Sequence, residues 1–368
     1  MKIVNKGTFA FEDSITQAAK LFPMYQVLNE DGEIVNPDLF PDVSDEKLVE
    51  LMKVLIFGRT YDERVIILNR QGALGNYPPA GGQEASQLAT TFALQDNDFL
   101  VPTYRDIPPL LLRGLTLEQA FLWYKGHIRS NQYPESITAF SPQVIVGGQM
   151  PHATGVAFGK RLKGEKNVVL AFCGDGGSSQ GDFYEGLNFA GVYNAPLITI
   201  LQNNGYGIST PTSKQTKALT FAQKGVAAGI ACIKVDGMDP LTMYSAVLKA
   251  REYAIENGPV LIEAYTYRLG PHTMSDDPTR YRSDEEVAEW QKKDPLIRLR
   301  KYLAKKGLWN ETMEEETVED VKRQIKEAMV NINKAEKQKI STFLEYMFEV
   351  PTQNIKEQIE IYKQREAG

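Results

Sequence analysis

The sequence predicts an α/β protein in which helices flank a parallel sheet. Residues 168–172 and 197–201 are short apolar runs, rich in β-branched side chains, with the length of buried strands. A helical pattern with Phe183 and Leu187 on one face separates them. Strand, helix and strand in this order favour parallel pairing, and ligands bind at the carboxyl ends of the strands in such sheets.

Composition restricts the class of protein. The 368 residues can bury a large core, and 42% hydrophobic and 24% charged residues are ordinary for a globular protein. The net charge of −6, without a dense Lys/Arg run outside the C-terminal helices, argues against a nucleic-acid partner. Cys173 and Cys232 make no disulfide framework. With no signal-peptide core and no apolar run near the ~18 residues of a membrane span, we expect a cytoplasmic protein without a membrane partner.

The first part of the chain predicts an arm and a long helix. Residues 1–43 are irregular, apart from a β-hairpin that turns at Asp31-Gly32. Residues 45–69 have helical periodicity, with Gly72 just past the end.

Later elements follow from caps and apolar runs. Thr116 and Gln119 have the spacing of a capping box, and Asp239-Pro240 suits a helix start. We expect helices from residues 116, 149 and 239, strands at 233–235 and 260–264, non-periodic loops at 209–216 and 270–282, and C-terminal helices after a capping box at 283–286. The chain then divides into an arm (1–43), a diphosphate-binding α/β domain (44–290, with leading helices 45–130) and a helical C-terminal region (291–368).

The loop at residues 174–181 carries candidate phosphate and metal ligands. Its glycines allow close approach to a ligand and positive φ, and the N-terminus of the following helix favours phosphate. Asp175 offers a carboxylate, Asn204 an amide oxygen, and the loop near Tyr206 a carbonyl. One carboxylate suits Mg²⁺ bound together with phosphate oxygens, so we expect a diphosphate carried on Mg²⁺. The glycines are Gly174, Gly176, Gly177 and Gly181.

Two familiar phosphate motifs are absent from this loop. A P-loop needs a Lys after its glycines, and G-x-G-x-x-G fails because position 179 is Ser179. Instead, Gly174-Asp175-Gly176 is followed, after 26 intervening residues, by Asn203-Asn204. This spacing resembles the motif of thiamine diphosphate (ThDP) enzymes. The segments GDGGSSQGDFYEGLNFAG and QNNGYGIST resemble the E1 α subunits of 2-oxoacid dehydrogenase complexes, closest to the pyruvate type of Gram-positive bacteria, over residues 44–368.

The resemblance implies a ThDP-binding fold and further cofactor residues. By position, Tyr104 and Arg105 would reach the diphosphate, and the planar fork of Arg105 suits phosphate oxygens. The alternative for Arg105 is a surface pair with Asp106. An apolar segment would receive the aminopyrimidine ring and hold the cofactor bent. Its residues are Val144, Ile145 and Val146.

Candidate catalytic residues also come from the resemblance. His272 would lie over the thiazolium ring, bind the diphosphate or substrate carboxylate, and move protons. Tyr281 and Arg282 match the same loop, which Arg282 would anchor. His127 would lie near the entrance to the active site, and the alternative is a solvated loop histidine.

Three residues have plainer expectations. Glu84, in a GQEA segment that the family shares, is either catalytic or, more simply, a first-turn acid that complements a helix dipole. His152 is expected to be structural. Thr273 stands where mitochondrial relatives have a phosphorylated Ser, so such regulation is not expected.

The resemblance implies oxidative decarboxylation of pyruvate and acetylation of the lipoyl group of an E2 acyltransferase. The chain has room for one α/β unit, so the glutamate that activates the aminopyrimidine is expected from a separate β subunit in an α₂β₂ heterotetramer. Branched-chain 2-oxoacids, with residues 76–79 as a candidate pocket wall, and acetoin are alternative substrates. A non-catalytic binding protein is disfavoured because Asp175 and Asn204 are present.

Overall fold

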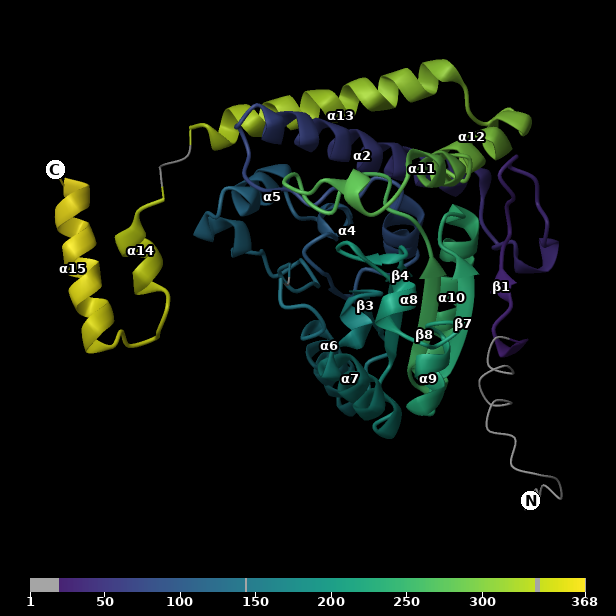
Figure 1. Ribbon diagram of the computed structural model, residues 1–368, viewed down its shortest axis with the longest axis horizontal. Helices are drawn as coiled ribbons and strands as arrows, with labels where there is room; N and C mark the ends of the chain where they lie inside the picture. Colours follow the sequence, from purple (N-terminus) through teal and green to yellow (C-terminus); the bar gives the residue numbers. More distant parts are fainter. Residues whose placement is uncertain (1–19, 143, 335–337, 368) are drawn as a thin grey trace.

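The centre of the structure is a six-stranded parallel sheet with the strand order β1-β7-β8-β4-β3-β2, which confirms the predicted α/β fold (Figure 1). This computed structural model describes residues 20–142, 144–334 and 338–367, so residues 1–19 of the predicted arm, and Gln143, lie outside the described residues. The strands are β1 (Met24–Tyr25), β2 (Phe99–Val101), β3 (Val169–Gly174), β4 (Leu197–Asn203), β7 (Ala231–Asp236) and β8 (Val260–Tyr265).

Strands β3 and β4 pair in register, and this pairing brings the two motif segments together. Val169 lies opposite Leu197, and Gly174 lies opposite Gln202. Because parallel strands end at the same edge of a sheet, the residues that follow them meet there.

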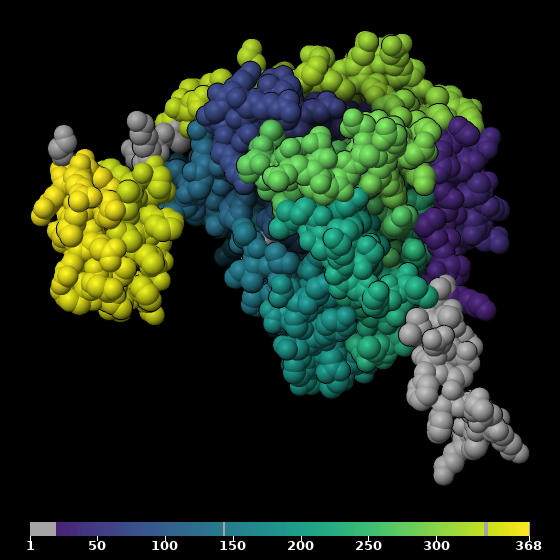
Figure 2. Space-filling model, in the orientation of Figure 1, coloured from purple at the N-terminus to yellow at the C-terminus, as the bar shows by residue number. Residues whose placement is uncertain are grey.

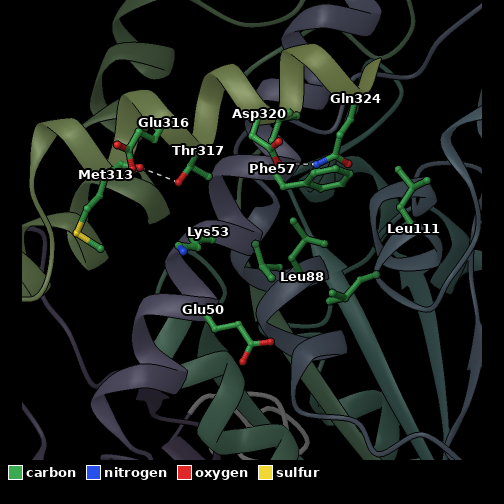
Figure 3. A pocket seen from close by; sticks show the side chains of 13 residues that line it. Glu50, Lys53, Phe57, Leu88, Leu111, Met313, Glu316, Thr317, Asp320 and Gln324 are labelled. Atoms are coloured by element: carbon green, nitrogen blue, oxygen red, sulfur yellow. Dashed lines mark hydrogen bonds between the residues drawn. The ribbon is translucent and has the colours of Figure 1, made fainter. Parts of the chain in front are cut away.

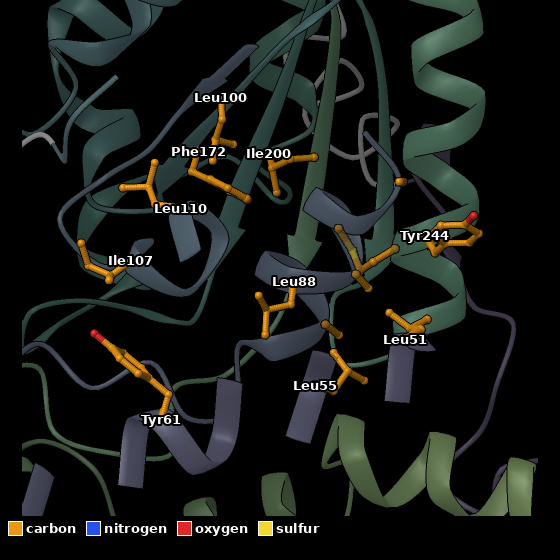
Figure 4. Packing of buried hydrophobic residues seen from close by; sticks show 14 of the residues in the cluster. Leu51, Leu55, Tyr61, Leu88, Leu100, Ile107, Leu110, Phe172, Ile200 and Tyr244 are labelled. Carbon is orange, nitrogen blue, oxygen red and sulfur yellow. The ribbon is translucent and has the colours of Figure 1, made fainter. Parts of the chain in front are cut away.

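Side chains alternate along β3 and enter two cores. Leu170 and Phe172 belong to the larger cluster, whereas Val169, Ala171 and Cys173 belong to the smaller one. Figure 4 shows part of the larger cluster, where side chains from three neighbouring strands lie close to those of the flanking helices. The residues from the strands are Leu100, Phe172 and Ile200.

Helices flank the sheet on both faces (Figure 1). Helices α6 and α7 pack into the smaller core, and α2, α4 and α10 contribute to the larger one. The helices expected from residues 45, 116, 149 and 239 are confirmed. Those of the α/β region are α2 (Asp45–Arg70), α3 (Thr90–Phe92), α4 (Ile107–Leu112), α5 (Leu117–Tyr124), α6 (Gln149–Leu162), α7 (Gly181–Val192), α9 (Gln223–Ala227) and α10 (Pro240–Asn257), with a π-helix at Ala85–Ala89.

Helix caps follow the sequence signals. Thr116 and Gln119 form a complete capping box at the start of α5. Asp239 caps α10 by accepting from the Leu241 N–H, and Gly258, at φ +99, follows its end. Sequence alone therefore located these helix boundaries.

The predicted N-terminal hairpin is confirmed over residues 27–35. The Asn29 N–H donates to the Glu33 carbonyl at 3.0 Å and the Val35 N–H to the Val27 carbonyl at 2.9 Å, on either side of an antiparallel bridge between Leu28 and Ile34, while β1, just before them, pairs with β7 at the edge of the main sheet. Val27 and Leu28 are fully buried, and their N–H groups donate to the Asp239 carboxylate at 2.9 and 2.6 Å. The polar requirement of a buried backbone decides the path of this segment.

The C-terminal region is helical, as predicted. Helix α13 runs along α2, while α14 and α15 pack on each other away from the sheet, and Figure 2 shows them as a separate lobe. Three side chains, Leu344, Ile355 and Ile359, form the buried centre of that lobe. The helices are α11 (Asp284–Gln291), α12 (Pro295–Lys305), α13 (Glu311–Ile332), α14 (Ile340–Glu345) and α15 (Gln353–Ala367).

The loop expected at residues 209–216 has more structure than its sequence suggested. Strands β5 (Tyr206–Gly207) and β6 (Thr210–Pro211) form a small hairpin, and α8 (Thr212–Gln215) follows. In the described part of the chain, no helix is both long and apolar enough to cross a membrane.

A buried ion pair joins α12 to the sheet and yields a stability prediction. The fully buried Arg298 donates to the Asp236 carboxylate at 2.6 Å and to the Leu28 carbonyl. Arg298→Met should lower the free energy of unfolding by about 3 kcal/mol, because it leaves the buried carboxylate without its cation. Chemical denaturation measures this change.

Lys301→Met, on the same helix, is the matched control. Lys301 pairs with Asp31, and both side chains are largely exposed to screening by solvent, so its loss should lower the free energy of unfolding far less than the loss of Arg298. Equal losses in the two variants would contradict the importance of the buried pair.

Candidate cofactor-binding site

A cavity of about 610 Å³ opens at the carboxyl ends of β3 and β4. Every residue that the sequence proposed for cofactor binding lines it, although these residues come from segments far apart in the chain. They are Tyr104, Arg105, Val144, Ile145, Val146, Gly174, Asp175, Gly176, Gly177, Asn204, Tyr206 and His272.

Asp175 is the buried acid of this cavity. Its Oδ2 accepts a hydrogen bond from Gln215 Nε2 at 2.9 Å. Burial raises its pKa to about 6, although the bond from Gln215 and backbone N–H groups oppose the shift. A cation beside Asp175 would relieve this penalty, because it favours the ionised form.

The amide of Asn204 is oriented by the loop that follows it. Its Oδ1 accepts from the Tyr206 N–H at 3.2 Å, and its Nδ2 donates to Gln83 Oε1 at 3.2 Å. Within the described ranges, no group of three or more His, Cys, Asp or Glu side chains could hold a metal by itself. One carboxylate with amide and carbonyl oxygens fits Mg²⁺ that shares its coordination with phosphate, so the donor set agrees with the expected ligand.

Gly176 and Gly177 serve close packing rather than unusual backbone angles. The expectation of positive φ is wrong for Gly174, Gly176, Gly177 and Gly181, whereas Gly205, at φ +87, and Ile208, at φ +62, have it after β4. A Cβ at Gly176 would lie 3.0 Å from the Gly207 Cα, and one at Gly177 would lie 2.8 Å from Cys173 Sγ. Glycine is required where two loops and a strand meet behind the cavity.

Gln149 leaves a polar atom unsatisfied in the cavity wall. Its Nε2 donates to the Phe172 carbonyl at 3.0 Å, but its buried Oε1 has no hydrogen-bond partner among the described residues. An unpaired buried acceptor costs free energy, so this atom favours a bound ligand with an N–H or O–H donor.

Arg105 is buried beneath the loop of residues 270–282 and contacts His272 in that loop. Its guanidinium donates to the Pro79 carbonyl at 2.6 Å, to the His272 carbonyl at 3.1 Å and to His272 Nδ1 at 3.1 Å. The alternative of a surface pair with Asp106 is wrong, since the buried Asp106 accepts instead from Thr103 and from side-chain amides.

His272 is held in one protonation state. Because Nδ1 accepts from Arg105, the ring proton lies on Nε2. Burial, and then the charges of Arg105 and Arg268, lower the pKa of His272 to about 4. The imidazole is therefore neutral at physiological pH and offers one N–H donor.

Tyr281 and Arg282 do not line the cavity but brace the loop that carries His272. The Tyr281 hydroxyl donates to Asp276 Oδ2 at 2.6 Å, and the same oxygen accepts from the His272 N–H at 2.7 Å. Arg282 donates to three successive carbonyls, those of Arg268, Leu269 and Gly270. Their geometry is that of supports for His272.

The other two histidines lie outside the cavity. His127 caps a 3-10 helix (Ile128–Asn131) by accepting from the Arg129 N–H, so the structure does not bring it to the site. His152 is exposed on α6 beside the ring of Phe140.

Glu84 stands at the start of a helix, as its simpler interpretation predicts, and it lies outside the cavity. Its buried carboxylate accepts from the Gly82 N–H and also forms an ion pair with Arg59 at 2.5 Å, which the sequence did not predict. Burial raises its pKa even though Arg59 opposes this. Of the candidate pocket wall at residues 76–79, Asn76 and Pro78 do line the cavity.

A network of buried glutamines supports the site, and the sequence did not predict it. Gln202 Oε1 accepts from Gln83 Nε2 at 2.6 Å, and Gln202 Nε2 donates to Asp106 at 2.9 Å, so the network reaches Asn204 through Gln83. A polar residue ending an apolar strand was the available signal for Gln202. Gln215, by contrast, comes 40 residues after Asp175, and no local pattern connects them.

Glu286 links the loop after β4 to the segment after β8, a role that the sequence did not predict. It stands at the predicted capping box of α11, where the Ser283 side chain accepts from the Glu286 N–H. The Glu286 carboxylate, however, accepts from the hydroxyls of Tyr206 and Tyr267, at 2.9 Å each. Only half of the capping box is therefore formed.

A second cavity, of about 590 Å³, lies between α2, α4 and α13 (Figure 3). Its floor is apolar, with Phe57 and Leu88, and its rim includes Glu50 and Asp320. None of the motif residues contributes to it, so we place the candidate site at the strand ends.

Comparisons with known proteins agree with this site. Residues 52–341 match the family described as the dehydrogenase E1 component. The chain is 54% identical over 355 residues to the pyruvate dehydrogenase E1 component subunit alpha of Staphylococcus epidermidis, with 96% of each chain covered. It is also 54% identical over 348 residues to the protein of the same name from Staphylococcus aureus, with 94% of each chain covered.

The His272 environment gives a testable titration. We expect its imidazole to remain neutral between about pH 5.5 and 8, because its pKa is about 4. Unfolded histidine binds a proton near its ordinary pKa of 6.5, so this residue lowers the free energy of unfolding as pH falls from 6.5 toward 4. Histidine carbon-13 NMR of the labelled chain measures the titration, with His272→Gln to assign the resonance. A midpoint near 6.5 would contradict the burial of His272.

Proposed function

The chain belongs to the dehydrogenase E1 component family, and from this membership we propose that it is the α subunit of a pyruvate dehydrogenase E1. Membership of the family implies the use of thiamine diphosphate and work within a complex that contains a β subunit and an E2 component. We propose the α₂β₂ heterotetramer, the E2 lipoyl group as acceptor, and Mg²⁺ as the metal.

The meeting of Asp175 and Asn204 at the ends of β3 and β4 is the observation that carries the proposal. Asp175, the Asn204 amide oxygen and the Tyr206 carbonyl would hold Mg²⁺, which in turn would hold the diphosphate. The N-terminus of α7 adds backbone N–H groups suited to phosphate.

The remaining cavity residues have roles that follow from their chemistry. Arg105 would donate to the diphosphate, because its guanidinium lies in the cavity wall with no carboxylate partner among the described residues. Val144, Ile145 and Val146 are 65%, 71% and 45% exposed, so a bound ring would cover apolar surface there. His272 would donate its Nε2–H to the substrate carboxylate or the diphosphate.

When bound, thiamine diphosphate supplies a nucleophilic carbon and an electron sink for the decarboxylation of a 2-oxoacid. This chain binds and orients the diphosphate end, and its neutral His272 provides a proton donor at Nε2. The described residues form one parallel sheet of six strands, and we propose that the glutamate that activates the aminopyrimidine comes from the β subunit.

Pyruvate is the proposed substrate because the relatives at 54% identity carry that name. Reconstituted with its β subunit, the chain should turn over pyruvate with a kcat/KM at least about 10-fold above that for 3-methyl-2-oxobutanoate, since extra methyl groups are sterically discriminated. A steady-state assay compares the two.

The isolated chain is the control and should show no turnover. Activity of the purified chain alone would refute the separate source of the glutamate. A preference for 3-methyl-2-oxobutanoate would instead assign the chain to branched-chain oxidation.

Asp175→Asn separates metal binding from folding. We expect Mg²⁺-dependent binding of ThDP to weaken at least about 10-fold, because the one carboxylate ligand is lost. The free chain should be no less stable near neutral pH, and up to about 3 kcal/mol more stable, since burial raises the pKa of Asp175 from 3.8 to about 6. The destabilisation that the buried Asp175 carboxylate causes in the wild type is absent below pH 3.8 and grows as pH rises toward 6.

Calorimetric titration and thermal unfolding measure both effects. Glu252→Gln, at an exposed acid on α10, is the control and should leave binding unchanged. Unaltered Mg²⁺ dependence in Asp175→Asn would show that the metal ligands lie elsewhere.

A further inference from the structure

A buried lysine lies behind the diphosphate loop and takes no part in the contacts described above. Lys224, on α9, is 6% exposed. Its Nζ donates to the Ser178 carbonyl at 2.7 Å and to Ser178 Oγ at 2.9 Å. Ser178 Oγ in turn donates to the Asp175 carbonyl at 2.7 Å. Hydrogen bonds thus connect the ammonium of Lys224 to the backbone of the proposed metal ligand.

The surroundings of Lys224 are aromatic. The rings of Phe183, Tyr184 and Phe221 have their centroids 5.7, 5.0 and 5.2 Å from Nζ. Within the described part of the chain, the ammonium forms no ion pair with a carboxylate, and its contacts are with neutral groups. Cation–π attraction compensates only part of the loss of hydration.

A buried cation without a counter-charge is costly, and a protein interior usually pairs it. An anion bound in the cavity could compensate the charge of Lys224. The loop on which Lys224 rests presents Asp175, Gly176 and Gly177 to the cavity, so an anion bound in the cavity would lie on the other side of the same loop. A positive charge in a poorly hydrated interior acts across such a loop with little screening.

We propose that Lys224 is a positioning residue of the cofactor site, which fixes the loop at Ser178 and supplies a buried positive charge that the bound diphosphate compensates. This deepens the proposed function and rests on it for the identity of the anion. The charge, rather than the hydrogen bonds alone, sets the affinity, so Lys224 selects for diphosphate esters over ligands with less negative charge.

Substitutions of Lys224 test the proposal in the full assembly reconstituted with the β subunit and freed of cofactor before titration. Lys224→Met keeps an unbranched chain and favourable sulfur–aromatic contacts, but it removes the charge. Lys224→Gln keeps a hydrogen-bond donor without charge, and Lys224→Arg keeps the charge. Calorimetric titration gives Kd for ThDP with Mg²⁺, thermal unfolding gives the Tm of the cofactor-free protein, and steady-state kinetics give kcat at saturating ThDP.

We expect Kd for ThDP to rise at least about 10-fold in both Lys224→Met and Lys224→Gln, and to stay within about 3-fold of the wild type in Lys224→Arg. The kcat at saturating ThDP should change less than about 3-fold, because Lys224 does not touch the substrate. The Tm of the cofactor-free Lys224→Met protein should be unchanged or higher, since replacement of an uncompensated buried ion by an apolar side chain is neutral or stabilising.

Lys234→Met is the matched control. Lys234 is on β7, and its ammonium lies 5.0 Å from the ring of Tyr265, on β8. This substitution removes a lysine with an aromatic contact and should change neither Kd nor kcat.

Two results would overturn the proposal. The first is wild-type affinity for ThDP in Lys224→Gln, which would leave only a hydrogen-bonding role. The second is a lowered Tm in cofactor-free Lys224→Met with unchanged Kd for ThDP, which would show that Lys224 has only a structural role.

Inorganic pyrophosphate with Mg²⁺ separates this inference from the proposed function. If the cofactor-free wild-type assembly binds pyrophosphate but not ThDP, the proposed function fails, while a weaker affinity of Lys224→Met for pyrophosphate still supports the inference. If the wild type binds both and Lys224→Met binds both equally well, the inference alone fails.

Discussion

The in-register pairing of β3 with β4 is the constraint on which the rest of the site depends. It sets Gly174 beside Gln202. The segments after β3 and β4, neither of which forms a binding site alone, therefore lie next to each other at one edge of the sheet. Asp175, Asn204 and the glutamine network then occupy fixed positions because buried strands cannot slip without turning apolar side chains toward solvent. The cavity is a consequence of strand register as much as of its own residues.

The site also contains three buried charged side chains. Asp175, Arg105 and Lys224 are all nearly inaccessible, and each lacks a full counter-ion in the described residues. They combine an acid that favours a bound cation with two cations that favour a bound anion. The metal diphosphate that we propose would compensate all three charges at once.

The sheet and the main helices were predicted from apolar periodicity and caps, and Asp175 and Asn204 from one spaced motif. Other residues of the cavity lining, such as Arg105 and His272, were predicted only through the resemblance to the E1 family. Prediction failed where a side chain's partner lies far along the chain. Glu84 stands at a helix start, as predicted, but its ion pair with Arg59, from α2, was not predicted. Gln215 and Lys224 showed no local signal, since only the fold brings them to Asp175 and Ser178. The roles of the loop glycines were misjudged because close packing between loops cannot be read from composition.

The two edges of the sheet carry a consequence for assembly. The outermost strands, β1 and β2, have two and three residues. Such short edges offer few free backbone groups, which protects a parallel sheet from adding strands of a neighbouring molecule and from ordered aggregation. These edges favour association of another subunit through the side chains of helices and loops rather than by extension of the sheet, which leaves the strand register of the cavity undisturbed.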